Sequence, residues 1–261
     1  MPCGSCGSDC TWRTPIPGCL WAGSTSGCSP ISMMVIKKLV FDEARVPFGA
    51  LKDALDDNFS SNPGLHALVQ KKVPRFGSGS EEALNMANAL TKLIHDLYSS
   101  RRNFRGGRYT SGFWSMSQHV AYGSLSGALP SGRLSSKAFT PGLTPHPGAS
   151  KSFLDNIRDV ARLDPVNMDN NMAFNVKLTP SPRDASEDIV NVMHSYVRTY
   201  FDQGGMQMQF NVVKSETLKD AMANPENYRN LLVRISGYNA YFVTLNTDMQ
   251  IELIERTEYG I

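Results

Sequence analysis

The thiol groups of this sequence are its first candidates for chemistry, because thiolates bind metals and act as nucleophiles. All five cysteines fall within the first 28 residues: Cys3, Cys6, Cys10, Cys19 and Cys28. Cys3, Cys6 and Cys10 have a spacing compatible with zinc or an iron–sulfur cluster. No histidine or fourth cysteine follows at the usual short distance, so the alternative is a tail that binds no metal.

A second candidate is the isolated Gly237, which separates an apolar, strand-like segment from the aromatic residues that follow. A glycine in such a place normally marks a tight turn or a close approach between two backbones. From residue types alone, Gly237 is therefore predicted to be a turn residue.

The composition is that of a folded protein. Of the 261 residues 41% are hydrophobic and 19% are charged, and the formal net charge is +2. So small a positive excess predicts neither a nucleic-acid partner nor an anionic membrane surface as a partner. The sequence has no apolar run of about 20 residues and does not open like a secretory signal. We therefore expect a soluble, cytoplasmic protein.

The elements that must position these residues alternate along the chain. Hydrophobic periodicity predicts helices at residues 31–43, 48–59, 64–72, 78–98 (from a capping box of Ser78 and Glu81), 152–163, 185–201, 215–222 and 248–257. Strands are predicted at residues 109–119, 172–178, 206–213 and 233–235. Residues 123–150 are rich in Gly, Pro and Ser and are predicted to be a functional loop or a linker. The alternation indicates an α/β or α+β arrangement.

Several motifs, in order, resemble the glycyl radical enzymes of the pyruvate formate-lyase type. Arg234-Ile235-Ser236-Gly237-Tyr238 resembles the C-terminal signature of that family. Further segments similar to the family are residues 37–41, 127–133, 204–207, 209–213, 224–229 and 254–258. The resemblance covers about residues 29–261.

The resemblance implies an α/β fold that forms part of the family's ten-stranded barrel, followed by a glycine-radical unit. Residues 29–139 would be the C-terminal part of the barrel domain, and residues 140–261 the glycine-radical domain. Residues 1–28 would be an arm outside the fold.

The resemblance also implies that Gly237 stores a radical, with Arg234, Ser236 and Tyr238 supporting its loop. A separate radical S-adenosylmethionine activating enzyme would remove one hydrogen atom from the α-carbon, and this chain would bind no cofactor of its own. The neighbouring amide nitrogen and carbonyl delocalise the unpaired electron, and a Cβ would obstruct the planar carbon. Such a loop would be shielded from water during turnover and would open for activation.

In the family the radical passes to a cysteine, whose thiyl radical attacks the substrate. No cysteine follows Cys28, and Cys19 lacks the glutamate expected two positions later, where Trp21 stands. We therefore expect the C-terminal portion of a longer, homodimeric enzyme, inactive by itself. The alternatives are a radical-bearing accessory subunit that complements a damaged enzyme and a small metal-binding protein.

Candidate substrate contacts are Trp114, Gln118, His119 and Arg133, although a structural role is the favoured interpretation of each, with Trp114 and His119 as core residues. Residues 113–117 resemble the family branch that acts on arylacetates or adds hydrocarbons to fumarate. The reaction implied is radical cleavage or rearrangement of a small organic acid or alcohol.

Overall fold

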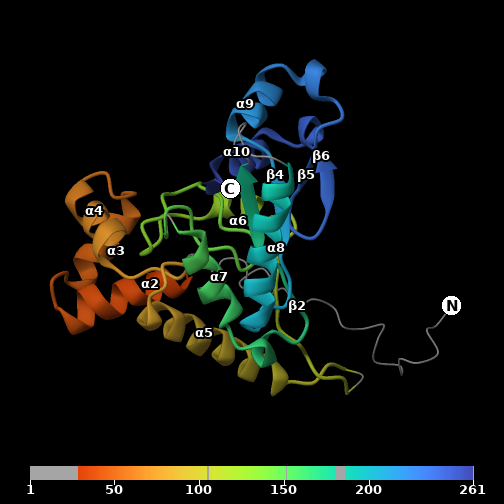
Figure 1. Cartoon of the computed structure of the whole chain (residues 1–261). Coiled ribbons are helices and arrows are strands. Elements are labelled where there is room, and N and C mark those ends of the chain that lie inside the picture. The colour runs from red at the N-terminus through yellow and green to blue at the C-terminus, as the bar shows by residue number, and fades with distance from the viewer. Residues whose placement is uncertain (1–28, 105, 151, 180–185, 261) are drawn as a thin grey trace.

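The computed structural model describes residues 29–104, 106–150, 152–179 and 186–260 (Figure 1). The arm of residues 1–28, with Cys3, Cys6, Cys10 and Cys19, lies outside the described residues, so the expectations for it stay predictions. None of the helices in the described part of the chain is both long and apolar enough to cross a membrane.

The first third of the described chain is helical, as the periodicity predicts. It consists of α2 (Ser29–Val35), the π-helix η2 (Ile36–Asp42) that continues it, α3 (Phe48–Asp56), α4 (Pro63–Lys72) and α5 (Glu81–Ser99). The predicted cap of α5 at Ser78 is wrong. Ser80 caps the helix by accepting the N–H of Ala83 at 3.4 Å, whereas the Ser78 hydroxyl donates to the carbonyl of Arg75 at 2.6 Å.

These helices share a core of their own. Ile31, Met34 and Val35 of α2 are fully buried and belong to one hydrophobic cluster with Leu51 of α3 and Val69 of α4. Figure 1 shows α2, α3 and α4 at one end of the molecule and the strands at the other.

The predicted strand at residues 109–119 is wrong for most of its length. Only β1 (Gly112–Phe113) is extended, and the helix α6 (Gln118–Leu125) already begins at Gln118. The reason is a turn at Met116, whose φ of 49° lies in the left-handed region, and the Gln118 N–H then bonds to the Ser115 carbonyl at 2.8 Å. Gln118 and His119 therefore lie on a helix.

The remaining elements alternate as the pattern predicts. They are α7 (Phe153–Ala161), η3 (Pro165–Met168), β2 (Asn171–Met172), β3 (Asn175–Thr179), α8 (Ser186–Asp202), β4 (Gln209–Val212), α9 (Ser215–Ala223), η4 (Pro225–Tyr228), β5 (Leu232–Arg234), β6 (Asn239–Tyr241), η5 (Phe242–Thr244), α10 (Thr247–Glu255) and β7 (Glu258–Gly260). The predicted strand at residues 172–178 is divided into β2 and β3, and the helix predicted to reach Thr257 ends two residues earlier.

The strands in the described residues form three small sheets. β4, β3 and β7 are parallel in that order, β1 pairs with β2 in parallel, and β5 and β6 form an antiparallel hairpin. The helix α8 makes the crossover from β3 to β4, as a parallel pair requires. Phe153 and Ile157 of α7, Val176 and Leu178 of β3 and Tyr200 of α8 share one core cluster. The chain therefore has the α/β class that its sequence predicts.

Candidate active site

Gly237 lies in the turn of the hairpin formed by β5 and β6. The N–H of Ile235 bonds to the carbonyl of Tyr238 at 2.9 Å, which closes the turn. Gly237 is exposed and has a φ of 87°, a conformation that other residues rarely adopt. A Cβ added to its α-carbon would meet no atom of the described chain within 4 Å. Its α-carbon is thus accessible from solvent, whereas the neighbouring Ser236 is completely buried.

Two polar side chains of β4 hold the hairpin. Asn211 bonds to both backbone groups of Arg234: its Oδ1 accepts the N–H at 2.7 Å, and its Nδ2 donates to the carbonyl at 2.6 Å. The Oε1 atom of Gln209 accepts two hydrogen bonds, one from Nε of Arg234 at 2.6 Å and one from the N–H of Gly237 at 3.3 Å. Arg234 is therefore fixed by β4 through both its backbone and its guanidinium group.

A buried ion pair lies behind the hairpin. Arg256 donates to both carboxylate oxygens of Glu252 at 2.9 and 2.8 Å, and both side chains are 6% exposed. Arg256 also donates to the carbonyl of Arg234 at 3.3 Å. Nε2 of His119 lies 3.4 Å from the Glu252 carboxylate. Burial disfavours the charge of Glu252, but the attraction of Arg256 and then of His119 outweighs it and lowers the Glu252 pKa to about 2.

The residues expected to face substrate differ in burial and in surroundings. Gln118 is exposed and shares a cavity of about 430 Å³ with Tyr238 of the hairpin turn and Asp248 of α10. His119 is buried, with its Nδ1 atom 3.1 Å from the Ser115 hydroxyl. Trp114 is half-buried. The structure thus brings one of these residues, Gln118, into a cavity that Tyr238 of the hairpin turn also lines.

Arg133 belongs to the irregular segment between α6 and α7. Its guanidinium group donates to four backbone carbonyls, those of Gly123, Ser126, Gly127 and Lys137, and stacks 4.4 Å from the ring centre of Phe139. The guanidinium is therefore engaged with the backbone of its own segment, and a role in substrate binding stays a prediction.

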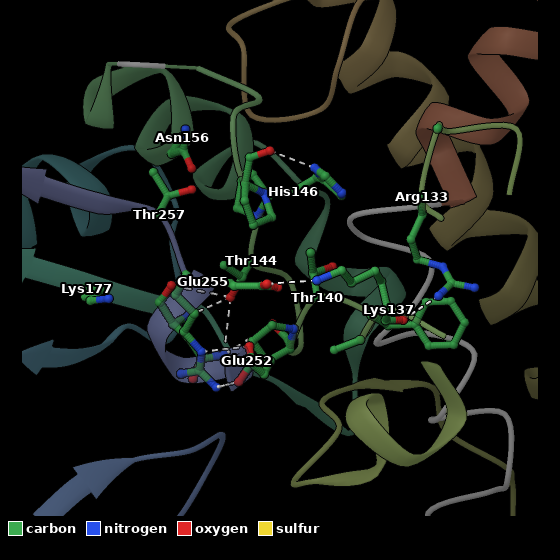
Figure 2. Close-up of a pocket in the computed structure, with 18 of the residues that line it drawn as sticks. Arg133, Lys137, Thr140, Thr144, His146, Asn156, Lys177, Glu252, Glu255 and Thr257 are labelled. Atoms are coloured by element: carbon green, nitrogen blue, oxygen red, sulfur yellow. Dashed lines mark hydrogen bonds and ion pairs between the residues drawn. The ribbon is translucent and has the colours of Figure 1, made fainter. Parts of the chain in front are cut away.

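A second cavity of about 360 Å³ lies between the same irregular segment and α10 (Figure 2). Lys137 and Glu255 form an exposed ion pair of 2.8 Å on its lining. Burial, and then the charge of Arg75, lower the pKa of His146 to about 4, so its imidazole is neutral at pH 7. Thr140 contributes a buried hydroxyl that has no hydrogen-bond partner in the described part of the chain. Arg133, which the sequence analysis expected to face substrate, lies on the lining of this cavity, whereas the turn residues 235–238 do not.

Gln209 and Asn211 belong to a segment that the sequence analysis found similar to the family, but it assigned neither residue a role. Their strand was predicted from its alternation, which normally places apolar side chains inward. Here Gln209 and Asn211 are buried, whereas Val212 is 51% exposed. The sequence did offer one signal for their role: two amide side chains occupy alternate positions of a strand that follows Gly204 and Gly205.

Two family models match the chain: "Pyruvate formate lyase-like" over residues 21–123 and "Glycine radical" over residues 139–243. The chain is 30% identical to the trans-4-hydroxy-L-proline dehydratase of Clostridioides difficile, over 87% of its own length and 29% of the relative's. It is 28% identical to the indoleacetate decarboxylase of Tractidigestivibacter scatoligenes, over 93% of its own length and 31% of the relative's.

The fold is similarly shared with solved structures. The B12-independent glycerol dehydratase from Clostridium butyricum, solved with glycerol bound, superposes with a TM-score of 0.84 at 32% identity. The match covers 92% of this chain and 30% of that structure, so the chain spans less than a third of the length of these relatives. Matches to both family models, and a fold shared with a dehydratase at this level of identity, establish that the chain belongs to the glycyl radical enzymes of the pyruvate formate lyase type.

Proposed function

We propose that Gly237 is the residue on which this chain stores a radical. The exposed α-carbon in the hairpin turn is the observation that carries the proposal, because an activating enzyme must reach the hydrogen atom that it removes. Removal of that atom leaves one unpaired electron on the α-carbon, between an amide nitrogen and a carbonyl that share it. A radical S-adenosylmethionine enzyme is the proposed partner, acting under oxygen-free conditions in the cytoplasm.

The proposed reaction is radical cleavage of a small polar organic molecule. The relatives include a dehydratase, a decarboxylase and a sulfite-lyase, whose names describe the loss of water, carbon dioxide or sulfite from a small substrate. The cavity shared by Gln118 and Tyr238 supports this proposal, since it adjoins the radical loop and is large enough for such a molecule. An arylacetate remains one of the proposed substrates.

Radical storage without turnover is the second candidate function. The cysteines of the sequence all precede residue 29, so a thiyl radical would have to form within residues 1–28 or on another polypeptide. We favour another polypeptide, which makes this chain either a part of the enzyme that is inactive alone or an accessory subunit.

Electron paramagnetic resonance of the purified chain tests radical storage. The chain is incubated without oxygen with S-adenosylmethionine and an activating enzyme, and we expect a doublet from the single α-hydrogen of a glycine radical. Gly237→Ala is the control, and it should fold because the added Cβ meets no atom of the described chain beyond the two neighbouring residues, so that only the strain of the positive φ remains. An unchanged doublet in that variant, or no doublet in the wild-type chain, contradicts the proposal.

A variant with all five cysteines replaced by serine separates the two candidates. We expect it to keep the doublet, and we expect neither it nor the wild-type chain to convert trans-4-hydroxy-L-proline, indoleacetate or glycerol. Conversion of any of these by the wild-type chain alone, lost in the five-serine variant, would refute the dependence on another polypeptide.

A further inference from the structure

We propose that Gln209 is a positioning residue for the radical glycine: its side-chain oxygen holds the N–H of Gly237 and thereby fixes the peptide plane that shares the unpaired electron. This inference rests on the proposed function of Gly237. It concerns a residue that lies 28 positions earlier in the chain, on a different sheet.

The side chain of Gln209 has a defined orientation. Its Nε2 atom donates to Oδ1 of Asn175 on β3. Asn175 in turn presents its own Nδ2 to the carbonyl of Pro141 at 3.2 Å, and a carbonyl can only accept. The Asn175 oxygen must therefore face Gln209, and the Gln209 oxygen must face the hairpin. The orientation of both amides follows from this chain of hydrogen bonds.

Side chains, rather than a shared ladder, connect β4 to the hairpin. β4 belongs to the three-stranded parallel sheet and β5 to the two-stranded hairpin. Asn211 bonds to the backbone of Arg234, and Gln209 extends the connection to Gly237. Gln209 is thus a side chain through which the three-stranded sheet restrains the glycine in the turn.

The N–H of Gly237 does not need a protein acceptor for solvation. Gly237 is exposed, so its N–H could bond to water at little cost, whereas Gln209 is buried, with 7% of the residue exposed, and its side-chain oxygen accepts that N–H. A fixed acceptor does what water cannot do: it holds the N–H in one direction. Delocalisation of an α-carbon radical requires the peptide planes on both sides of the α-carbon to be coplanar with it. At the φ of 87° they are not coplanar, so the chain must rotate about the N–Cα bond of Gly237 when the radical forms. The bond to Gln209 fixes the orientation of the preceding peptide plane, from which that rotation starts.

The Gln209 oxygen also connects Gly237 to a positive charge. Arg234 donates to the same oxygen from a shorter distance, 2.6 Å against 3.3 Å. A charge-assisted bond is the stronger of the two, so Arg234 helps to fix the oxygen that receives the glycine N–H. Arg234 then acts on the glycine through Gln209.

Three variants of the 261-residue chain test the inference. Gln209→Met removes the acceptor at similar volume, Gln209→Glu keeps an oxygen at that position, and Asn239→Ala is the matched control. Asn239 accepts from the Arg234 guanidinium at 3.2 Å on the exposed side, and Gly237 is not among its hydrogen-bond partners in the described part of the chain.

The first measurement needs no radical: it is amide hydrogen exchange at Gly237, resolved by NMR. We expect Gln209→Met to accelerate exchange at Gly237 by roughly fivefold, the effect of losing one hydrogen bond. Gln209→Glu and Asn239→Ala should stay close to the wild-type rate. An unchanged rate in Gln209→Met, or an equal acceleration in Gln209→Glu, overturns the inference.

The second measurement is electron–nuclear double resonance of the activated chain. The coupling of the exchangeable Gly237 N–H proton should change in Gln209→Met and be restored in Gln209→Glu, and the radical should decay faster in Gln209→Met. A merely structural role would leave that coupling unchanged. If the wild-type chain forms no radical, the proposed function fails, and the exchange rates still decide whether Gln209 holds the glycine N–H.

Discussion

Replacing Glu252 by glutamine tests whether the hairpin of β5 and β6 depends on the buried ion pair behind it. Glutamine keeps the shape of the side chain but leaves the charge of Arg256 without its counterion at a site that is 6% exposed. Arg256 also donates to the carbonyl of Arg234, so the loss should spread to the hairpin.

Two independent arguments give the magnitude. The Glu252 pKa is lowered from 4.5 to about 2, which corresponds to about 3 kcal/mol in favour of the folded state at neutral pH. Removing one partner of a buried ion pair typically costs about 3–5 kcal/mol. We therefore expect Glu252→Gln to lower the free energy of unfolding by about 3 kcal/mol.

Glu255 provides the matched control because it lies on the same helix and also forms an ion pair. Its partner is Lys137, and the two side chains are 51% and 54% exposed. Such a pair contributes about 0–1 kcal/mol, so Glu255→Gln should change little. Urea unfolding at pH 7, followed by tryptophan fluorescence, measures both variants. Equal losses in the two variants, or a loss below about 1 kcal/mol in Glu252→Gln, would refute the reasoning.

Three further predictions concern the pH dependence of the same ion pair, two glycines and a buried lysine. Because the folded-state pKa of Glu252 is lowered, its contribution to the free energy of unfolding is present above about pH 4.5 and is lost as the pH falls towards 2. Acid unfolding of Glu252→Gln should therefore be less steep in that range than acid unfolding of the wild type. Gly142→Ala should lower the free energy of unfolding by about 2–4 kcal/mol, because its Cβ would lie 2.2 Å from the Ala173 carbonyl oxygen at a φ of 57°. Gly237→Ala, which meets no such atom, should cost about 1 kcal/mol. Thermal melts of the two variants measure the difference. Lys177→Met should cost about 1–3 kcal/mol in urea, because the buried ammonium donates to two carbonyls at the end of α10, at 3.3 and 3.1 Å.

The helices could be predicted from the sequence because each one carries its own apolar period. Residues 48–59 and 64–72, for example, predicted α3 and α4 to within a few positions. The strand predicted at residues 109–119 failed because a single left-handed residue, Met116, turns the chain into α6. Nothing in the residue types on either side marks that turn.

The site could be predicted in part. The turn at Gly237 followed from an isolated glycine between a strand and an aromatic segment, and the structure confirms a turn there with positive φ. The pairing of Arg234 with Gln209 and Asn211 could not be predicted, because it joins residues on separate sheets. The alternation of β4 was visible, and Phe210 packs against the core, but Gln209 and Asn211 on the other face are buried as well, and only the hairpin packed against them explains why.

The order of strands in the parallel sheet has a consequence for the way in which the chain folds. β3 is the central strand, and its two partners lie at very different distances along the chain: the contact from Asn175 to Gln209 spans 34 residues, and the contact from Thr179 to Glu258 spans 79. Closing the longer loop costs more chain entropy, so we expect β7 to dock last. Until it does, one edge of β3 is an unpaired template that a neighbouring molecule can extend. Aggregation during refolding should therefore depend on protein concentration, and an intact C-terminal strand should suppress it.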